Sequence, residues 1–321
     1  MRYRRGKRRM PSVQQFEFSR DEELLRIERE IRAGTWRHSP YRTFVVCDPK
    51  PRSITAAAVR DRVVHQVVFE EVERAFEPRF LPNSYSARRH RGVHLALNHV
   101  ERAATTLRRQ GHSVLWAAKG DVAKFYDSVD HRILGVLLRR RITDANLLQM
   151  IETILGSYHS RFGEGKGIPI GNITSQVFAN VYLHELDHFA VHRLRARTYF
   201  RYADDILVVS PERAEAEHAA LHLQAYASEH LELDLKLRPP RKLSSGVDFL
   251  GSILWPYGRT LRRQTRARVV QRTRMRVRLA GEGLVTAASL RSTRASYRGM
   301  SMRVRDRALN LMLMDSGEGA E

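Results

Sequence analysis

The sequence predicts an α+β protein, in which helices and strands alternate without the regular crossovers of a parallel sheet. Residues 22–33 and 56–76 carry apolar side chains at helical spacing, whereas residues 113–118 and 198–210 are rich in β-forming side chains. The 321 residues include no internal repeat, low-complexity stretch or long Pro/Gly linker. We therefore expect continuous subdomains that pack against one another around a core of appreciable size.

The N-terminal part is predicted to hold a helix, a strand and a second helix. The helical spacing of residues 22–33 stops at Gly34, and glycine is common just past a helix end. Residues 44–47, Phe-Val-Val-Cys, are followed by Asp-Pro-Lys-Pro at 48–51, which predicts a strand that enters a loop. The second helix is expected over residues 56–76.

Two strand regions are predicted to bring acidic residues to their ends. Residues 113–118 form a short apolar run typical of a buried strand, and Lys119-Gly120-Asp121 follow at its end. Residues 198–210 have β-forming side chains on both sides of Ala203-Asp204-Asp205, which predicts a hairpin with the acidic pair at its turn.

Two further helices are predicted. Thr174 or Ser175 is expected to cap a helix that carries apolar residues as far as Phe189. Residues 262–278 hold eight arginines in seventeen positions with interleaved Val and Met, which predicts a basic helix. Such a dense run of one charge repels itself without a partner, although an ordinary solvated helix face is the alternative. The acidic residues 315–321 are expected to fray.

The charge of the chain favours a polyanionic partner. Its 56 Lys and Arg residues against 35 Asp and Glu residues give a formal net charge of +21. All but seven of the basic residues are arginine, whose planar fork suits bidentate contacts to phosphate. A GC-rich genome also favours arginine and contributes to this excess.

Cysteine usage and hydropathy indicate the cellular compartment in which the protein is expected. The single cysteine, Cys47, excludes an internal disulfide framework and a zinc finger, and it fits a reducing compartment. No segment reaches the roughly 18 apolar residues that a membrane span requires. The basic segment 1–10 is not followed by the apolar run of a secretory signal, and we interpret it as a nucleic-acid-binding arm. A cytoplasmic bacterial protein that does not contact membranes is expected.

Asp121, Asp204 and Asp205 have the chemistry of a two-magnesium site. Magnesium prefers oxygen ligands, partial coordination by protein and room for substrate phosphates. Such a site activates a primer 3′-hydroxyl and stabilises a leaving pyrophosphate, with no need for a protein nucleophile. The alternative for the adjacent pair is turn chemistry, because Asp is a normal hairpin residue. Asp127 and Asp130 are interpreted as turn or cap residues.

The order of several motifs resembles the reverse transcriptases. Tyr202-Ala203-Asp204-Asp205 is similar to the signature hairpin of that family, and Asp121 lies in Gly-Asp-Val-Ala-Lys-Phe-Tyr upstream of it. Further similar segments between residues 40 and 255 are Lys50-Pro51-Arg52, Asp61-Arg62-Val63-Val64-His65, Asn83-Ser84-Tyr85-Ser86 with Gly92, and Phe249-Leu250-Gly251. The resemblance implies an RNA-directed DNA polymerase of right-hand architecture that uses two magnesium ions.

That architecture implies a division of the chain and a set of partners. We expect a basic arm and helix over 1–35, fingers over 36–112, a palm over 113–255 and a small helical thumb over 256–321, with a fingers insertion at about 132–170. The implied partners are template RNA, primer, the RNA–DNA hybrid and deoxynucleoside triphosphates. A non-catalytic nucleic-acid-binding protein on a polymerase fold is the rival hypothesis, and the intact set of three aspartates argues against it.

A second motif narrows the resemblance. Most reverse transcriptases have Gln-Gly-x-x-x-Ser-Pro where this chain has Ile-Gly-Asn-Ile-Thr-Ser-Gln at residues 170–176. That substitution resembles the polymerases of diversity-generating retroelements, and Ser-Tyr-Arg-Gly at 296–299 is similar to their short thumb. The resemblance implies mutagenic retrohoming, with errors opposite template adenine and a small basic accessory protein that forms an oligomer. Retron, group II intron-like and antiviral-defence reverse transcriptases share most of the motifs and stay open as alternatives.

The resemblance also assigns roles to individual residues. Metal ligation is assigned to Asp121, Val122, Asp204 and Asp205, with the three aspartates as the catalytic residues. Tyr126 lies where the family places its steric gate against ribose, and a core aromatic residue is the alternative. Nucleotide contacts are assigned to Lys50, Arg52, Tyr126, Gly171 and Gln176, fidelity to Ile170 and Gln176, and the primer grip to Phe249, Leu250 and Gly251. Lys236 and Lys242 are both candidates for the general acid.

Overall fold

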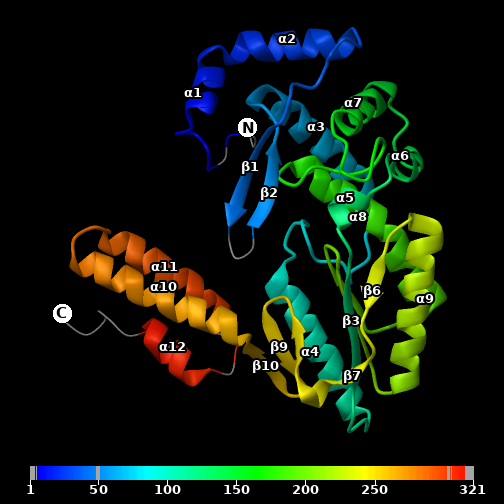
Figure 1. Cartoon of the computed structure of the whole chain (residues 1–321), viewed down its shortest axis with the longest axis vertical. Coiled ribbons are helices and arrows are strands. Elements are labelled where there is room, and N and C mark those ends of the chain that lie inside the picture. Colours follow the sequence, from blue (N-terminus) through cyan, green and yellow to red (C-terminus); the bar gives the residue numbers. More distant parts are fainter. Residues whose placement is uncertain (1–3, 5, 48–50, 302–303, 305, 315–321) are drawn as a thin grey trace. The chain divides into compact units, whose positions relative to one another are not determined.

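The computed structural model describes all residues except 1–3, 5, 48–50, 302–303, 305 and 315–321. The chain divides into two units, and it passes between them several times. The first unit comprises residues 1–90, 121–195 and 222–236, and the second comprises residues 91–120, 196–221 and 237–321. Both contain helices, and the strand pairings are antiparallel (Figure 1), which confirms the predicted α+β class.

The N-terminal part of the first unit is two helices, a hairpin and a long helix. Gly34 has φ +67° just after the second of these helices and donates its N–H to the Ile31 carbonyl, as expected past a helix end. The predicted start of the next helix at residue 56 is wrong, because Ala56 still pairs with Arg42 in the hairpin. The elements are α1 (Pro11–Phe18), α2 (Arg20–Arg32), β1 (Arg42–Cys47), β2 (Pro51–Ala56) and α3 (Val59–Phe76).

The first unit also contains a largely buried helix, α8 (Ile173–His188), which packs against α3. The predicted cap is wrong, because Asn172 is the N-cap residue and makes no side-chain capping bond. Thr174 and Ser175 instead lie inside the first turn, where the Ser175 hydroxyl donates to the Pro169 carbonyl at 2.7 Å. The other elements are α5 (Phe125–Ser128), α6 (His131–Arg139), α7 (Ala145–Gly156) and a π-helical turn (Phe189–Arg193) that continues α8.

The central sheet is built on an antiparallel strand, β3 (Trp116–Val122), which begins three residues later than the predicted strand. Asp121 therefore lies inside β3 rather than after it. The predicted hairpin over 198–210 is confirmed, since β4 (Tyr199–Tyr202) pairs with β5 (Asp205–Ser210). The strand order is β4-β5-β3-β6, with β6 at Leu235–Leu237, and β7 (Arg241–Lys242) also pairs with β3. Helix α4 (Val93–Arg109) packs against β4. Helix α9 (Arg213–Leu231) follows β5 in the chain.

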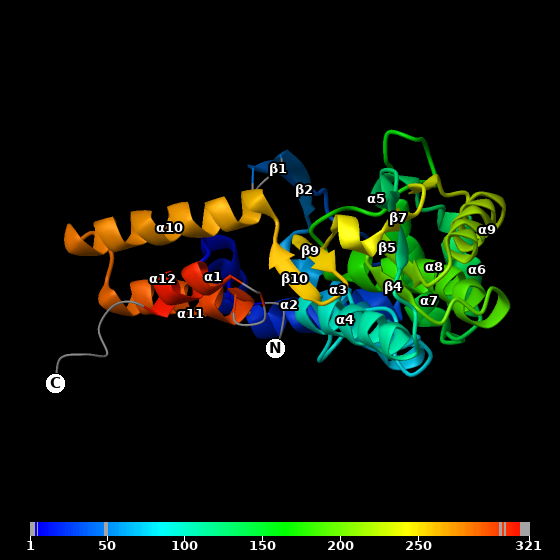
Figure 2. The same cartoon turned by 90° about the horizontal axis from the view of Figure 1, so that it is seen from below.

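The C-terminal part of the second unit is a small sheet followed by three helices. The strands β8 (Val247–Phe249), β9 (Ser252–Trp255) and β10 (Gly258–Leu261) form a sheet of order β10-β9-β8. Helices α10 (Arg263–Gly281) and α11 (Ala287–Ser301) run side by side with α12 (Arg307–Met314) against them, as Figures 1 and 2 show. The predicted basic helix is confirmed as α10, which buries only Val269 and Thr273. No helix within the described ranges is long and apolar enough to cross a bilayer.

Candidate functional site

The acidic hairpin presents two adjacent carboxylates at a tight turn. Tyr202 and Asp205 are the last paired residues of β4 and β5, so Ala203 and Asp204 form a two-residue loop. Ala203 has φ +53°, the left-handed conformation that such hairpin turns require. The guanidinium of Arg201, which is fully buried, donates to the Ala203 carbonyl at 3.1 Å. A buried cation therefore holds the backbone of the turn from beneath.

Strand β3 runs beside this hairpin and carries the third carboxylate. Gly120 pairs with Ile206, the residue after Asp205, and Asp121 directly follows Gly120 in β3. The Asp121 residue is exposed, whereas Val122 is buried with 1% of its surface exposed. Alternation along the strand thus directs the acidic side chain away from the core.

A lysine on the same strand offsets one of these negative charges. The Lys119 ammonium lies 3.7 Å from a carboxylate oxygen of Asp205, and both side chains are partly exposed. Ion pairs of this kind contribute little to stability, about 0–1 kcal/mol, because water screens them. The Lys119–Asp205 pair therefore orients the Asp205 carboxylate and offsets its charge, and it contributes little to the stability of the fold.

The donor set fits a hard divalent cation by its chemistry. Asp121, Asp204 and Asp205 offer only carboxylate oxygens, which magnesium prefers over nitrogen and sulfur ligands. Asp121 belongs to the first unit, and Asp204 and Asp205 belong to the second. Among the described residues, no group of three or more His, Cys, Asp or Glu side chains is gathered closely enough to hold a metal ion. The metal assignment therefore rests on the donor chemistry and on the strand register.

Tyr126 differs from the aromatic residue before it. Phe125 has 1% of its surface exposed and fills the core, whereas Tyr126 is only partly buried. The two rings meet edge to face, with centroids 5.4 Å apart. The Tyr126 carbonyl accepts a hydrogen bond from the Ile168 N–H at 2.8 Å, which ties short helix α5 to the segment before α8. Core packing thus occupies Phe125 and leaves Tyr126 partly accessible.

The Gly171 loop, residues 169–172, is held against strand β2 of the N-terminal β1–β2 hairpin. The Thr55 N–H donates to the Ile170 carbonyl at 2.8 Å, and the Asn172 amide donates to the Thr55 carbonyl at 2.8 Å. Gly171 has φ +120°, and a Cβ there would lie 2.7 Å from the Ile54 Cγ2 atom. Glycine is therefore required both by backbone conformation and by the approach of β2. This approach to Ile54 is within the protein, and the approach of the Gly171 backbone to a nascent base pair stays a prediction.

The other predicted nucleotide-binding residues lie on or near these elements. Arg52 is an exposed residue of β2 opposite Val46, and Lys50 lies outside the described residues. Gln176 is exposed in the first part of α8, and Ile170 is partly buried in the loop. The positions of Arg52, Ile170, Gly171 and Gln176 all belong to the first unit.

The predicted primer-grip segment forms the turn between β8 and β9. Leu250 and Gly251 have φ +50° and +79°, and Phe249 is fully buried. The Gly251 carbonyl accepts the Arg262 N–H at 3.1 Å, which joins the turn to the start of α10. Of the two general-acid candidates, Lys236 pairs with Asp234 at 3.1 Å and Lys242 lies 5.7 Å from the centre of the Trp116 ring. Neither contact favours one lysine over the other.

A buried polar chain behind the Gly171 loop was not predicted from the sequence. The His65 Nδ1 atom lies 2.7 Å from the Thr174 hydroxyl, and its Nε2 atom lies 3.0 Å from His38 Nε2. Burial, reinforced by the nearby His38, lowers the pKa of His65 to about 3. The ring is therefore neutral at pH 7 and serves as a hydrogen-bonding link between α3 and α8. His38 and His65 are 27 positions apart in the sequence, so only the fold brings them together.

The interpretation of Asp130 as a cap residue is confirmed, because it is the N-cap residue of α6. Its carboxylate accepts the Ile133 N–H at 2.9 Å at the start of α6 and lies 3.0 Å from the Lys166 ammonium. Burial opposes ionisation, but the hydrogen bonds from Ile133 and Lys166 outweigh it and lower the pKa of Asp130. Asp127 lies in α5 and pairs with Arg161 at 3.2 Å.

Comparisons with known proteins identify a matching family and several similar chains. The family described as Reverse transcriptase (RNA-dependent DNA polymerase) matches residues 48–254. Protein YkfC of Escherichia coli strain K12 is 26% identical over 270 residues, which cover 71% of this chain and 70% of that protein. The Group II intron-encoded protein LtrA of Lactococcus lactis subsp. cremoris is 28% identical over 212 residues, which cover 63% of this chain and 32% of LtrA.

A solved structure with a similar fold is telomerase from Candida albicans, in complex with a fragment of telomeric RNA, with a TM-score of 0.53. The match covers 72% of this chain and 47% of the telomerase chain at 11% identity, so it shows the fold alone. That likeness confirms the predicted polymerase fold. This chain thus spans about a third of LtrA and about half of the telomerase chain. With the family match over residues 48–254, it follows that the chain belongs to the reverse transcriptase family of RNA-dependent DNA polymerases.

Proposed function

We propose that this chain extends a primer on an RNA template by transferring deoxynucleotides, with Asp121, Asp204 and Asp205 as the catalytic carboxylates. The observation that carries this proposal is the hairpin register. Tyr202 pairs with Asp205, so Asp204 and Asp205 lie at the turn. Gly120 pairs with Ile206, and the third carboxylate, Asp121, is the residue that follows Gly120 in β3. A merely structural turn needs one such residue, not three on two strands.

Two magnesium ions are the cofactors that this donor set favours, since reverse transcriptases as a family use divalent metals. Bound there, they would activate the primer 3′-hydroxyl and neutralise charge on the triphosphate. Val122 offers no side-chain ligand, so only its carbonyl would join the three carboxylates. Because the nucleophile is the primer, no serine, cysteine or histidine of the chain has to form a covalent intermediate.

The nucleotide-selecting part of the site is proposed to lie in the first unit. The Tyr126 ring would exclude a ribose 2′-hydroxyl, and its partial exposure next to the fully buried Phe125 supports that role. Arg52 would contact the triphosphate, and Gly171 would bring backbone close to the base pair that forms. The primer grip at Phe249, Leu250 and Gly251 and the division into fingers, palm and thumb complete this proposal.

We further propose that the polymerase belongs to the diversity-generating subfamily, with adenine-directed errors and a small basic accessory protein as a partner. Ile170 and Gln176 support this, because they replace the Gln and Pro that most reverse transcriptases have at these positions. A group II intron-like enzyme is the alternative, and the similarity to LtrA favours it. A pair of near-identical genomic repeats that differ at adenines next to the coding sequence would discriminate between the two.

The direct test of polymerase activity is primer extension by the purified chain on a defined RNA template with deoxynucleoside triphosphates and Mg²⁺. We expect templated DNA synthesis that stops when EDTA removes the metal. A matched reaction with ribonucleoside triphosphates tests sugar selection on the same preparation. No extension from a preparation that binds the template–primer hybrid would refute the proposal.

A further inference from the structure

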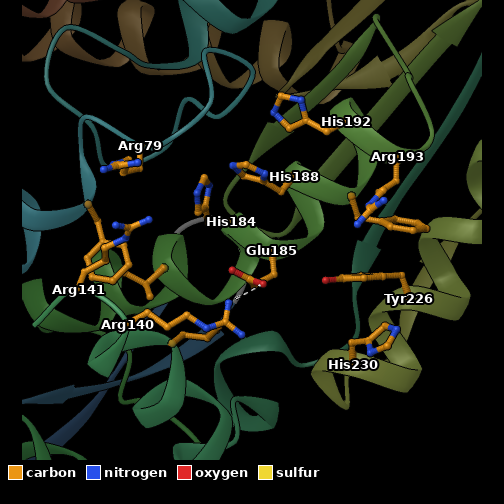
Figure 3. Close-up of a pocket in the computed structure, with 14 residues that line it drawn as sticks. Arg79, Arg140, Arg141, His184, Glu185, His188, His192, Arg193, Tyr226 and His230 are labelled. Carbon is orange, nitrogen blue, oxygen red and sulfur yellow. Dashed lines mark hydrogen bonds and ion pairs between the residues drawn. The ribbon is translucent and has the colours of Figure 1, made fainter.

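The first unit contains a cavity of about 630 Å³ that none of the proposed catalytic residues lines. Its walls come from the segment after α3, from α6, from α8 with its π-helical turn, and from α9 (Figure 3). Of the ten polar residues that line it, four are arginines and four are histidines.

The arginines of this cavity are mostly not neutralised by neighbours. Glu185 is the only acidic residue in its wall, and one of its carboxylate oxygens lies 3.0 Å from Arg140. Within the described part of the chain, Arg79, Arg141 and Arg193 make no ion pair with an acidic side chain. Like charges gathered in one concave surface repel one another and attract anions. The cavity is therefore built to receive negative charge.

The histidines form a continuous row rather than a metal site. His184, His188 and His192 recur every four residues and so share one face of α8 and its π-helical extension. Their ring centroids are 4.6 Å and 4.7 Å apart along the row. Among the described residues no group of three or more potential ligands is placed to hold a metal ion. Ring N–H groups instead extend the set of donors along the cavity wall.

Two aromatic rings also line the cavity. Phe189 and Tyr226 are stacked with centroids 4.2 Å apart and planes inclined by 14°. Figure 3 shows the Tyr226 hydroxyl directed toward the Glu185–Arg140 pair. Burial, and then the Glu185 charge, raise the pKa of Tyr226, so the phenol keeps its proton at neutral pH and can donate it in a hydrogen bond. Aromatic rings that line a cavity together with arginines and hydrogen-bond donors are a pattern of nucleic-acid binding.

We propose that this cavity binds the phosphates of an RNA strand, as a second RNA contact in addition to the template–primer hybrid. The arginine fork matches phosphate bidentately, which favours phosphate over carboxylate partners. Arg79 and Arg141 lie on one side of the cavity and Arg193 on the other (Figure 3), so the cations suit a repeating polyanion better than a single phosphate. The choice of RNA rather than another phosphate polymer rests on the proposed function.

The test is a pair of charge-matched double variants of the whole chain. Arg79→Gln/Arg141→Gln removes two cations from the cavity. Arg29→Gln/Arg37→Gln removes two exposed cations elsewhere in the first unit, and among the described residues both side chains bond only to backbone carbonyls. The affinity of each protein for fluorescent polyuridylate is measured between about 50 and 200 mM salt. No primer, triphosphate or Mg²⁺ is present, so the outcome does not depend on polymerase activity.

We expect the cavity variant to bind about tenfold more weakly at low salt, with a salt slope smaller by about 1.4, since each lost phosphate contact to single-stranded nucleic acid removes about 0.7. The control variant keeps the wild-type slope. Arg79→Lys/Arg141→Lys retains the charge and is expected to restore the slope, which excludes misfolding as the cause. Equal slopes for the cavity and control variants would overturn the proposal.

Uridine monophosphate distinguishes a strand from a free nucleotide. If it raises the melting temperature of the wild type but not of the cavity variant, and the polyuridylate slopes are equal, the cavity takes a free nucleotide and the RNA proposal is wrong. If neither probe discriminates between the variants, a phosphate site is excluded. A wild-type chain that binds RNA through the cavity but extends no primer would refute only the polymerase proposal.

Discussion

The acidic hairpin and the Gly171 loop both belong to the proposed active site, but they are held in place by different kinds of contact. The hairpin is fixed by neighbours in sequence, since Tyr202 pairs with Asp205 and Arg201 supports the Ala203 carbonyl. The loop is fixed by residues more than a hundred positions away, through Thr55 and Ile54 of β2. A substitution in the hairpin should therefore affect chemistry alone, whereas one in the loop should affect folding as well.

The largest effect is expected at the hairpin. Asp205→Asn and Asp204→Asn should each reduce primer extension by about a thousandfold, because a lost metal ligand removes several kcal/mol of transition-state stabilisation. RNA affinity and the melting temperature should change little. Asp21→Asn, at an exposed carboxylate of α2, is the control. Substantial extension by either hairpin variant would contradict the metal assignment.

At the loop, Gly171→Ala should reduce both stability and activity. The new Cβ would approach the Ile54 side chain, and φ +120° is unfavourable for any residue with a side chain. We expect a loss of about 2 kcal/mol in the free energy of unfolding, measured by urea denaturation. Gly156→Ala at the end of α7, where a Cβ has open space, is the matched control. Equal stability for the two variants would remove the contrast between loop and hairpin.

This contrast also explains which features the sequence predicted. The hairpin over 198–210 and the helix that ends before Gly34 were predicted because turn residues and local spacing determine them. Strand β2 was missed, because its Pro51 start resembles a loop and its partner β1 supplies the pairing. The helix cap was misplaced, because the hydroxyl of Thr174 bonds to His65 rather than to its own helix. Long-range partners decide such cases, and a single sequence does not show them.

Tyr126 connects to the segment before the Gly171 loop through its carbonyl, yet its ring is expected to act on substrate. Tyr126→Ala should raise ribonucleotide incorporation relative to deoxynucleotide on the order of tenfold, because removing the ring opens space beside the sugar. Tyr126→Phe keeps the ring and should keep the ratio. Competition between the two nucleotide types on one RNA template measures the ratio of ribonucleotide to deoxynucleotide incorporation. An unchanged ratio in an active Tyr126→Ala variant would make Tyr126 a packing residue.

The His65 link behind the loop predicts a pH dependence of stability that the hairpin does not share. His65 has a pKa of about 3 in the folded chain and an ordinary value of 6.5. Below about pH 6.5 the unfolded chain binds a proton that the folded chain does not, so stability is full above that pH and falls as the pH drops toward 3.

We expect His65 to contribute up to about 1.4 kcal/mol of this loss per pH unit. His65→Gln should therefore show a shallower decline than the wild type in urea denaturation at a series of pH values, even if it is less stable at pH 7. His218→Gln, at an exposed histidine of α9, should follow the wild-type slope. Parallel slopes for the wild type and His65→Gln would show that His65 is protonated in the folded chain.

The smallest effect is expected for fidelity, where the loop would act on the template base. The Ile170 carbonyl is already bonded to the Thr55 N–H, so only its side chain is available to change contacts near the nascent pair. Ile170 lacks the amide that most family members have there, and a single hydrogen bond worth roughly 1 kcal/mol changes selectivity only a few-fold. We predict that Ile170→Gln lowers misincorporation opposite adenine by a few-fold and preserves overall extension, with Ile170→Leu as the control. Sequencing of cDNA made from one RNA measures this, and wild-type errors spread evenly over the four template bases would exclude the diversity-generating subfamily while leaving the polymerase assignment intact.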